Sequence, residues 1–397
     1  ATKHNENELA HTFSSIRKLQ RLMATVVVAI YLLFVSLCIP ENKPLYFIES
    51  LWIINCFIDI NWFFWGLEKV KLTVTRNLII KLITLSGIFI FVKTRKDILI
   101  YAFILVIGTI LSDLYLVSQV KKYIKGTRTT FYEMIIHIKP CITLFIPVVA
   151  MSIYQQMDKT MLGLLSTYEQ VGYYSSADKI VNIPLGIITG LGTVSLPRIV
   201  SLISEKKIME YKKVVEKSIS LVMFMCSAIA FGILAVSQEF VPLFFGNQFY
   251  GAILPMQIAS VLLLSIGLNN LNGIQVLISI GKDRQFLYSV LGGAIANFLL
   301  NLYLIPKYGA VGAAFSSVYA ETQILIVNEF CVRKYTSVRV TNFSDMGKAM
   351  GGALCFIPIC VFIGTIVKDW FFICTCIIVC TLFYLVLQYV LKNSIIN

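Results

Sequence analysis

Long apolar runs separated by short polar segments recur along the whole chain. Most runs have about twenty residues, the length a helix needs to span about 30 Å of hydrocarbon. The sequence lacks the alternation in segments of about ten residues that is typical of a transmembrane barrel. The pattern predicts an all-α polytopic membrane protein. We place twelve helices at 22–40, 45–65, 77–92, 98–118, 135–155, 171–195, 218–238, 253–280, 286–304, 311–330, 349–367 and 370–391.

Composition supports this class and narrows the possible chemistry. The 397 residues are 57% hydrophobic and 14% charged, whereas a soluble domain has about 25% charged residues. The ten cysteines form no Cys-x-x-Cys pair, and the histidines are only three. We therefore interpret the cysteines as small apolar fillers and predict neither a metal site nor a cofactor.

The basic residues set the predicted orientation. With the N-terminus in the cytoplasm, 24 of the 34 Lys and Arg residues fall in inside segments and 7 in outside segments. This split obeys the positive-inside rule and places both ends of the chain in the cytoplasm. Because the charges are spread over many loops, they indicate topology and not a nucleic-acid surface. No loop is long enough for a soluble domain.

An internal repeat divides the chain. Residues 66–72 and 281–287 both read Gly, any, acid, base, any, any, Leu, 215 residues apart, between helices that match in order. Parallel repeats of this kind enclose a central cavity that opens to either side. We predict an N-terminal lobe of four helices at 1–130, a C-terminal lobe of six at 131–335, and a final helix pair at 336–397. The C-terminal lobe begins with two helices that have no counterpart in the N-terminal lobe. This difference predicts a further helical hairpin before residue 1.

Several segments resemble one family of transporters. Residues 59–68 read Asp-Ile-Asn-Trp-Phe-Phe-Trp-Gly-Leu-Glu, and residues 157–159 read Met-Asp-Lys. Residues 172–179 read Gly-Tyr-Tyr-Ser-Ser-Ala-Asp-Lys, and 197–198 read Pro-Arg. Together they resemble the Wzx-type O-antigen and capsule flippases of the multidrug/oligosaccharidyl-lipid/polysaccharide exporter superfamily, over essentially the whole chain.

The resemblance implies a function and a location. Such a flippase moves an undecaprenyl-pyrophosphate-linked oligosaccharide across the bacterial inner membrane by alternating access, here with ion coupling. The expected partners are the lipid-linked substrate, membrane lipids, and the polysaccharide polymerase with its chain-length regulator. Nucleic acid is not expected.

A pyrophosphate dianion needs cations along its route through hydrocarbon. Lys81 lies about 7 Å and Lys179 about 12 Å into their predicted helices, at about 1.5 Å per residue. Lys139 and Arg76 lie near inner helix ends. All four are candidates for this lining. Alternatively, Arg76, Lys81 and Lys139 extend to the lipid headgroups.

Acidic residues in or next to the predicted helices are candidates for gating and coupling, with Asp158 near the outer rim and Asp178 deeper in the next helix. Asp158 and Asp178 lie in the hairpin with Lys159 and Lys179, which suggests an ionic latch between helices. Glu321 is the deepest carboxylate, and we consider a proton or sodium site there, or a structural hydrogen bond.

Polar and aromatic residues complete the expected cavity. Asn297 and Asn301 are four residues apart and share one helix face, so we expect them to line the cavity. Tyr173 and Tyr174 either contact sugars or belong to an aromatic belt at the interface.

Two other functions remain open. The first is a different exporter of the same superfamily, for drugs or for a lipid-linked precursor. A drug exporter would need an acidic cavity. The second is an enzyme such as a polysaccharide polymerase or an acyltransferase. A polymerase would need a larger outer loop, and an acyltransferase would need a positioned base such as His137.

Overall fold

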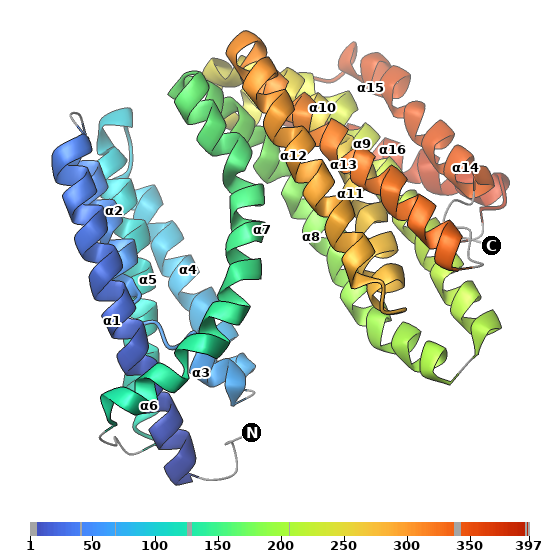
Figure 1. Ribbon diagram of the computed structural model, residues 1–397. Helices are drawn as coiled ribbons and strands as arrows, with labels where there is room; N and C mark the ends of the chain where they lie inside the picture. The colour runs from blue at the N-terminus through green and yellow to red at the C-terminus, as the bar shows by residue number, and fades with distance from the viewer. Residues whose placement is uncertain are drawn as a thin grey trace. The chain divides into compact units, whose positions relative to one another are not determined.

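The computed structural model describes residues 6–39, 42–67, 69–124, 129–205, 207–336, 343–393 and 395. Within this part of the chain nearly every residue is helical and no strand occurs, which confirms the predicted all-α class (Figure 1). Nine helical segments of the described residues are long and apolar enough to cross a membrane. The chain is therefore a multi-pass membrane protein, and the count of twelve stays a prediction. It splits into two compact units, Ala1–Val149 and Ala150–Asn397.

Unit 1 is an antiparallel bundle in which α5 is central. Helix α2 and helix α4 both pack against α5, and α1 packs against α2. The elements are α1 (Glu6–Cys38), α2 (Lys43–Asn55), α3 (Asn61–Gly66), α4 (Val70–Phe91), η1 (Arg95–Asp97), α5 (Ile98–Val120), α6 (Phe131–Ile136) and the first part of α7 (Ile138–Leu165).

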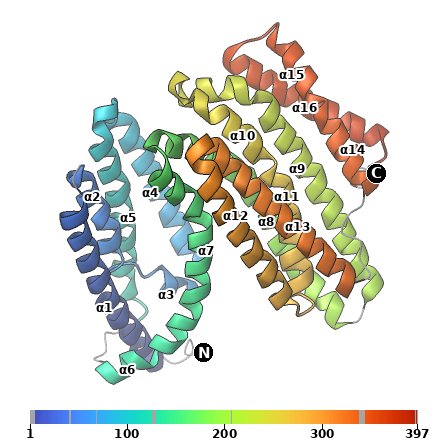
Figure 2. The same cartoon turned by 45° about the horizontal axis from the view of Figure 1, so that its top comes forward.

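Unit 2 contains the remainder of α7 and all later helices. Helices α12 and α13 run side by side, and α9 carries the final hairpin on its far flank (Figure 2). The elements are α8 (Tyr168–Ser204), α9 (Ile208–Phe245), η2 (Asn247–Ala252), α10 (Ile253–Ser260), α11 (Leu262–Asn269), η3 (Asn270–Ile278), α12 (Asp283–Tyr308), α13 (Ala310–Tyr335), α14 (Phe343–Leu354), α15 (Phe356–Gly364) and α16 (Asp369–Val390).

The internal repeat is visible in the packing inside each unit. Helices α1, α2, α4 and α5 correspond in order to α9, the α10–α11 pair, α12 and α13. In unit 1, α2 and α4 flank α5, and in unit 2, α11 and α12 flank α13 in the same way. The two bundles are thus built on one plan, as the repeated motif predicts.

One predicted helix, 45–65, is interrupted. Helix α2 ends at Asn55 and α3 begins at Asn61. The side chain of Gln20 donates to the carbonyls of Cys56 and Asp59 at 2.6 and 2.7 Å. The carboxylate of Asp59 accepts the backbone N–H of Asn61 at 2.9 Å. These side chains satisfy the backbone groups that the break releases, so the chain can bend here.

The corresponding helix of unit 2 is irregular at the same place. After Asn269 the α-helix becomes the π-helical segment η3. Asn55 and Asn269 are 214 residues apart, whereas Gly66 and Gly281 are 215 apart. Unit 2 therefore carries one extra residue between these points, which the wider turns of a π-helix accommodate. Both units interrupt the same helix of the repeat.

Large apolar side chains cover the outward face of the helices. On α4, the residues Leu78, Leu82, Leu85 and Phe89 follow one another at helical spacing and are all exposed. A continuous apolar surface of this kind is stable in hydrocarbon and not in water. The fold therefore presents its apolar surface to lipid and gathers its polar side chains inside each bundle.

Candidate functional site

Asp158 on α7 lies where four helices of unit 2 meet. Its side chain is buried, and its carboxylate accepts three hydrogen bonds of 2.6 Å. The donors are the hydroxyls of Tyr174 on α8 and Ser317 on α13, and the amide of Asn301 on α12. The Asn301 amide also donates to Asn297 at 3.1 Å. We call these five residues the Asp158 centre.

Small residues bring the helices of this centre together. Asn297 and Asn301 project from the buried face of α12, one turn apart. Gly312 on α13 lies so close to α12 that a Cβ atom there would be 2.5 Å from the carbonyl oxygen of Leu304. Only glycine allows this approach, which places Ser317 within reach of Asp158.

Hydrogen bonds, and no ion pair among the described residues, hold the Asp158 carboxylate. Among the described residues, no Lys or Arg side chain forms an ion pair with Asp158. Asn301 is fully buried and its Oδ1 atom has no hydrogen-bond partner. A buried carboxylate needs hydrogen bonds and a compensating charge. Three donors thus surround one carboxylate, and Asn301 Oδ1 is an unused acceptor next to them.

A second carboxylate lies on α13, one helical turn after Ser317. Glu321 accepts hydrogen bonds from the Tyr154 hydroxyl of α7 and the Asn269 amide of α11, each at 2.8 Å. The Asn269 side chain in turn accepts a hydrogen bond from Asn328 at 3.4 Å. Within the described part of the chain, no Lys or Arg forms an ion pair with Glu321 either. Among the described residues, unit 2 therefore holds two buried or nearly buried carboxylates that form hydrogen bonds but no ion pair.

These groups form a polar row along one face of α13. Ser317, Glu321 and Asn328 are separated by four and seven residues, which places them on one side of the helix over about 16 Å. We expected Glu321 but missed Ser317, Asn328 and Tyr154. The helical spacing of polar residues within the apolar stretch 311–330 could have indicated Ser317 and Asn328.

The acid–base residues of the α7–α8 hairpin separate into different environments. Lys159 on α7 pairs with Asp178 on α8 at 2.8 Å, and both side chains are partly exposed. Asp158 faces the interior of unit 2, whereas Lys179 is exposed. An ion pair between the two helices therefore exists. Its role as a latch stays a prediction.

The polar and aromatic residues that we expected to line a cavity also fall into a buried group and a more accessible one. Tyr174, Asn297 and Asn301 are buried around Asp158, so none of them presents a polar group to a surface in this conformation. Tyr173 lies nearer the outside, where its hydroxyl contacts the carboxylate of Glu169. Contact of these residues with sugars stays a prediction.

Arg76 occupies the polar interior of unit 1. It is buried and pairs with Asp113 on α5 at 3.2 Å. Its guanidinium also donates to the carbonyl of Ser112 at 2.8 Å and to the side-chain oxygens of Asn61 and Asn77 at 2.8 and 2.7 Å. A buried acid therefore holds Arg76 inside the bundle, and its role in binding pyrophosphate stays a prediction.

The remaining predicted cations are more accessible. Lys81 and Lys139, both in unit 1, are exposed. Neither of them joins the buried group around Arg76. The structure therefore does not gather the basic side chains of unit 1 into one cluster, and a role for each in binding pyrophosphate stays a prediction.

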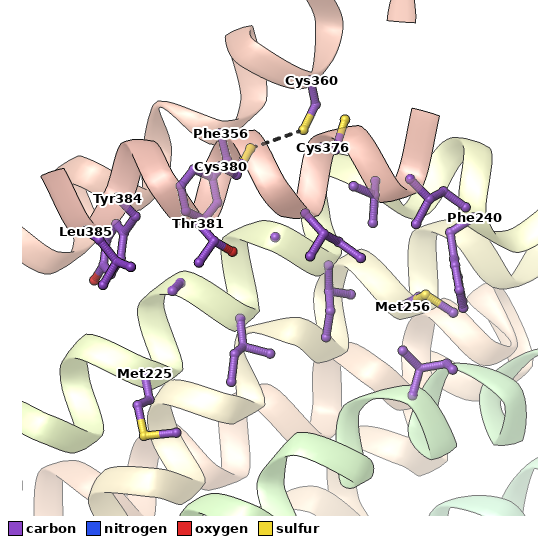
Figure 3. Close-up of a pocket in the computed structure, with 18 of the residues that line it drawn as sticks. Met225, Phe240, Met256, Phe356, Cys360, Cys376, Cys380, Thr381, Tyr384 and Leu385 are labelled. Atoms are coloured by element: carbon purple, nitrogen blue, oxygen red, sulfur yellow. Dashed lines mark hydrogen bonds between the residues drawn. The ribbon is translucent and has the colours of Figure 1, made fainter. Parts of the chain in front are cut away.

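An apolar cavity of about 450 Å³ lies where α9 packs against the final hairpin (Figure 3). Aromatic and aliphatic side chains line it, together with three cysteines. The sulfur atoms of Cys360 on α15 and Cys380 on α16 are 3.7 Å apart, with Cys376 nearby. These three residues act as small apolar wall residues of the cavity, in keeping with the interpretation of the cysteines as fillers.

The fold and the polar centres define a helical membrane protein with two related bundles. A family model described as "Polysaccharide biosynthesis protein" matches residues 2–203, and the chain belongs to that family. It is 24% identical over 306 residues to a protein of Escherichia coli (strain K12) named "Putative O-antigen transporter", covering 76% of this chain and 74% of the relative.

A relative matched over a shorter length and a solved structure extend the comparison. The chain is 25% identical over 202 residues to the Haloferax volcanii protein "Probable low-salt glycan biosynthesis flippase Agl15", covering 49% of this chain and 41% of the relative. It resembles the structure "Lipid II flippase MurJ, inward closed conformation" with a TM-score of 0.70 and 16% identity, over 99% of this chain and 86% of that one. That likeness shows the fold alone. The relatives are named as transporters and flippases, in agreement with the prediction that the chain is not an enzyme.

Proposed function

We propose that this protein flips an undecaprenyl-pyrophosphate-linked oligosaccharide, an O-antigen or capsule repeat unit, across the bacterial inner membrane. The observation that carries this proposal is membership of the polysaccharide biosynthesis family, together with relatives named for O-antigen transport and glycan flipping. The flipping proceeds by alternating access, with both chain ends in the cytoplasm. The polymerase and its chain-length regulator receive the product on the outer face.

The proposed route keeps each part of the substrate in a matching environment. The glycan travels through water, and the pyrophosphate passes basic side chains, because a bare dianion is very costly in hydrocarbon. Lys179 is the basic residue best placed for this role within unit 2. It is exposed, and its neighbour Asp178 is already paired with Lys159, so its charge is available to an anion.

The apolar cavity beside the final hairpin suits the polyprenyl chain. Phe224, Phe240 and Phe356 contribute to its wall, and polar atoms are nearly absent from it. A lipid segment in this cavity would exchange one apolar environment for another at little cost in free energy.

We further propose that a cation at the Asp158 centre couples transport to an ion gradient. Binding there would neutralise Asp158 and supply a partner for the orphaned Oδ1 atom of Asn301. The centre joins α7, α8, α12 and α13, so its occupancy changes the cohesion of four helices at once. A transporter coupled to an ion gradient needs such a difference in helix–helix hydrogen bonding between its loaded and empty states.

Deletion of the gene in the parent bacterium tests the proposed function. Lipid-linked repeat units should accumulate on the cytoplasmic leaflet, and surface polysaccharide should disappear. Complementation with the wild-type gene should restore both. Undiminished surface polysaccharide in the deletion strain, with no related flippase to replace the protein, would contradict the proposal.

A further inference from the structure

Arg17 on α1 is a partly buried cation whose hydrogen-bonding capacity is unused. Its Nε atom is buried and has no hydrogen-bond partner. Among the described residues, the Arg17 guanidinium forms neither a hydrogen bond nor an ion pair. The Nε atom of Arg76 is also unpartnered, but the terminal nitrogens of that residue donate to four acceptors. Arg17 differs because the protein offers its guanidinium no acceptor at all within the part that the structure describes.

An aromatic platform holds Arg17 in place. Its guanidinium carbon lies over the Phe13 ring, 5.5 Å from the ring centre. The buried Phe13 packs against Trp62 and Phe63 of α3, with ring centres 5.5 and 4.7 Å apart. The Trp62 indole donates to the side chain of Gln20 at 3.1 Å, which joins α3 to α1 one turn beyond Arg17. The protein thus positions this guanidinium by packing and leaves its donors for another molecule.

Arg21 adds a second positive charge one turn after Arg17. Residues four apart on a helix are neighbours on its surface, with about 5–6 Å between their Cβ atoms. Arg21 is exposed, and no ion pair of the described chain includes it. Lys18 has a different contact, because its ammonium group donates to the carbonyl of Thr129 at 3.1 Å. Two like charges at this spacing destabilise each other, and a bound anion would relieve the repulsion.

The position of the two arginines along α1 indicates which anion they meet. Residues 22–38 carry no charged side chain, so Arg21 is the last charged residue before the apolar stretch of this helix. Arginine at such a boundary lies at the level of lipid phosphate groups. Guanidinium groups bind phosphate oxygens in a bidentate way. A phosphodiester headgroup offers a single negative charge, whereas a pyrophosphate offers a charge for each guanidinium.

We propose that Arg17 and Arg21 bind the pyrophosphate of the polyprenyl carrier at the cytoplasmic end of α1, where unit 1 first contacts the substrate. The inference rests on the proposed function and on its orientation of the chain, and it deepens both. Lys179 in unit 2 is a separate contact of the proposed route. Binding is measured without transport, so either proposal can fail alone.

The test measures binding of a short carrier analogue to the purified full chain in detergent. Radiolabelled farnesyl pyrophosphate is the probe, at constant ionic strength, with farnesyl monophosphate and phosphatidylglycerol as competitors. Arg17→Gln and Arg21→Gln should each weaken binding about tenfold, because each removes a charge-assisted hydrogen-bond donor. Arg17→Lys keeps the charge and should weaken binding less. Unchanged binding by both glutamine variants overturns the inference.

Lys213→Gln provides the matched control, because it removes an exposed positive charge from α9 of unit 2. Its affinity for the probe should equal that of the wild type, and an equal loss in this variant would reduce the effect to net charge and overturn the inference. The unfolding temperatures of Arg17→Gln and Arg21→Gln should stay close to that of the wild type, since neither guanidinium bonds to the described protein.

Two further measurements identify the site and the ligand. A photoreactive farnesyl pyrophosphate should label α1 or α3, and labelling confined to unit 2 would overturn the inference. Displacement of the probe by phosphatidylglycerol as readily as by unlabelled farnesyl pyrophosphate would also overturn it, because an ordinary headgroup would then be the ligand. If Arg17 and Arg21 bind the probe but deletion of the gene leaves surface polysaccharide unchanged, this site stands and the proposed function fails.

Discussion

Asp158 and Asn301 are 143 residues apart in the chain and are joined by a hydrogen bond of 2.6 Å inside unit 2. The bond links α7 to α12, and further bonds to Tyr174 and Ser317 extend the link to α8 and α13. A single carboxylate thereby holds four helices. Its charge state should control both the stability of this bundle and its ability to change shape.

The first prediction concerns Asp158→Asn. The amide keeps the size of the carboxylate but replaces one acceptor oxygen with a donor that faces the Asn301 amide or the two hydroxyls. We expect loss of transport and of cation-dependent stabilisation, with a decrease of about 1–3 kcal/mol in the free energy of unfolding. Thermal unfolding with and without sodium, alongside surface polysaccharide in cells, measures both effects.

Ser317→Ala provides the matched control for that substitution. It removes one neutral donor and leaves the carboxylate, so we expect a smaller decrease of about 0.5–1.5 kcal/mol and retained response to sodium. If the two variants lose the same stability and the same response to sodium, the charge of Asp158 does not determine either property.

The second prediction concerns the buried ion pair of unit 1. Arg76→Gln leaves Asp113 as an unpaired buried charge and should destabilise the protein by about 3–5 kcal/mol. Adding Asp113→Asn removes that charge and should recover much of the loss. A double-mutant cycle on unfolding temperatures measures the coupling between the two residues. Additive losses would argue that Arg76 acts through other partners.

The third prediction concerns Lys179. Reversal of its charge in Lys179→Glu should repel an anionic carrier lipid and abolish surface polysaccharide, whereas Lys179→Arg should retain output. Because the side chain is exposed, neither change should alter stability by more than about 0.5 kcal/mol. Normal polysaccharide in the Lys179→Glu strain would remove this residue from the proposed route.

The fourth prediction concerns the apolar cavity beside the final hairpin. Gly232 lines the cavity, and a Cβ atom there meets no other atom within 4 Å. Gly232→Phe should therefore fill the cavity while the protein still folds, and transport should fall at least tenfold. Gly232→Ala leaves most of the volume and should transport normally, with a gain of about 0.5–1 kcal/mol in stability. Full transport by Gly232→Phe would show that lipid does not use this cavity.

The sequence predicted the parts of the fold that depend on local pattern. Apolar runs of membrane length placed most helices, and the Gly66 and Gly281 motifs revealed the repeat. The break after Asn55 was not predictable, because it depends on Gln20 reaching the carbonyls of Cys56 and Asp59 from another helix.

Sequence patterns singled out Asp158, Asn301 and Glu321 as candidate site residues, whose roles stay predictions, but did not show their contacts. Their partners came from helices distant in sequence, as when Arg76 pairs with Asp113, 37 residues away. Spacing along a chain indicates which face of a helix a residue occupies, but not which other helix covers that face.

The buried carboxylates of the two bundles differ in how their charge is neutralised, and this difference affects how each bundle responds to the membrane potential. Arg76 neutralises the charge of Asp113, whereas no Lys or Arg within the part of the chain that the structure describes pairs with Asp158 or Glu321. One elementary charge crossing the membrane field is worth about 2.3 kcal/mol per 100 mV. If an ion couples transport as proposed, we expect the resting potential to act mainly on the second bundle when that ion has left. Voltage imposed on proteoliposomes should speed or slow the return of the empty carrier far more than the loaded step.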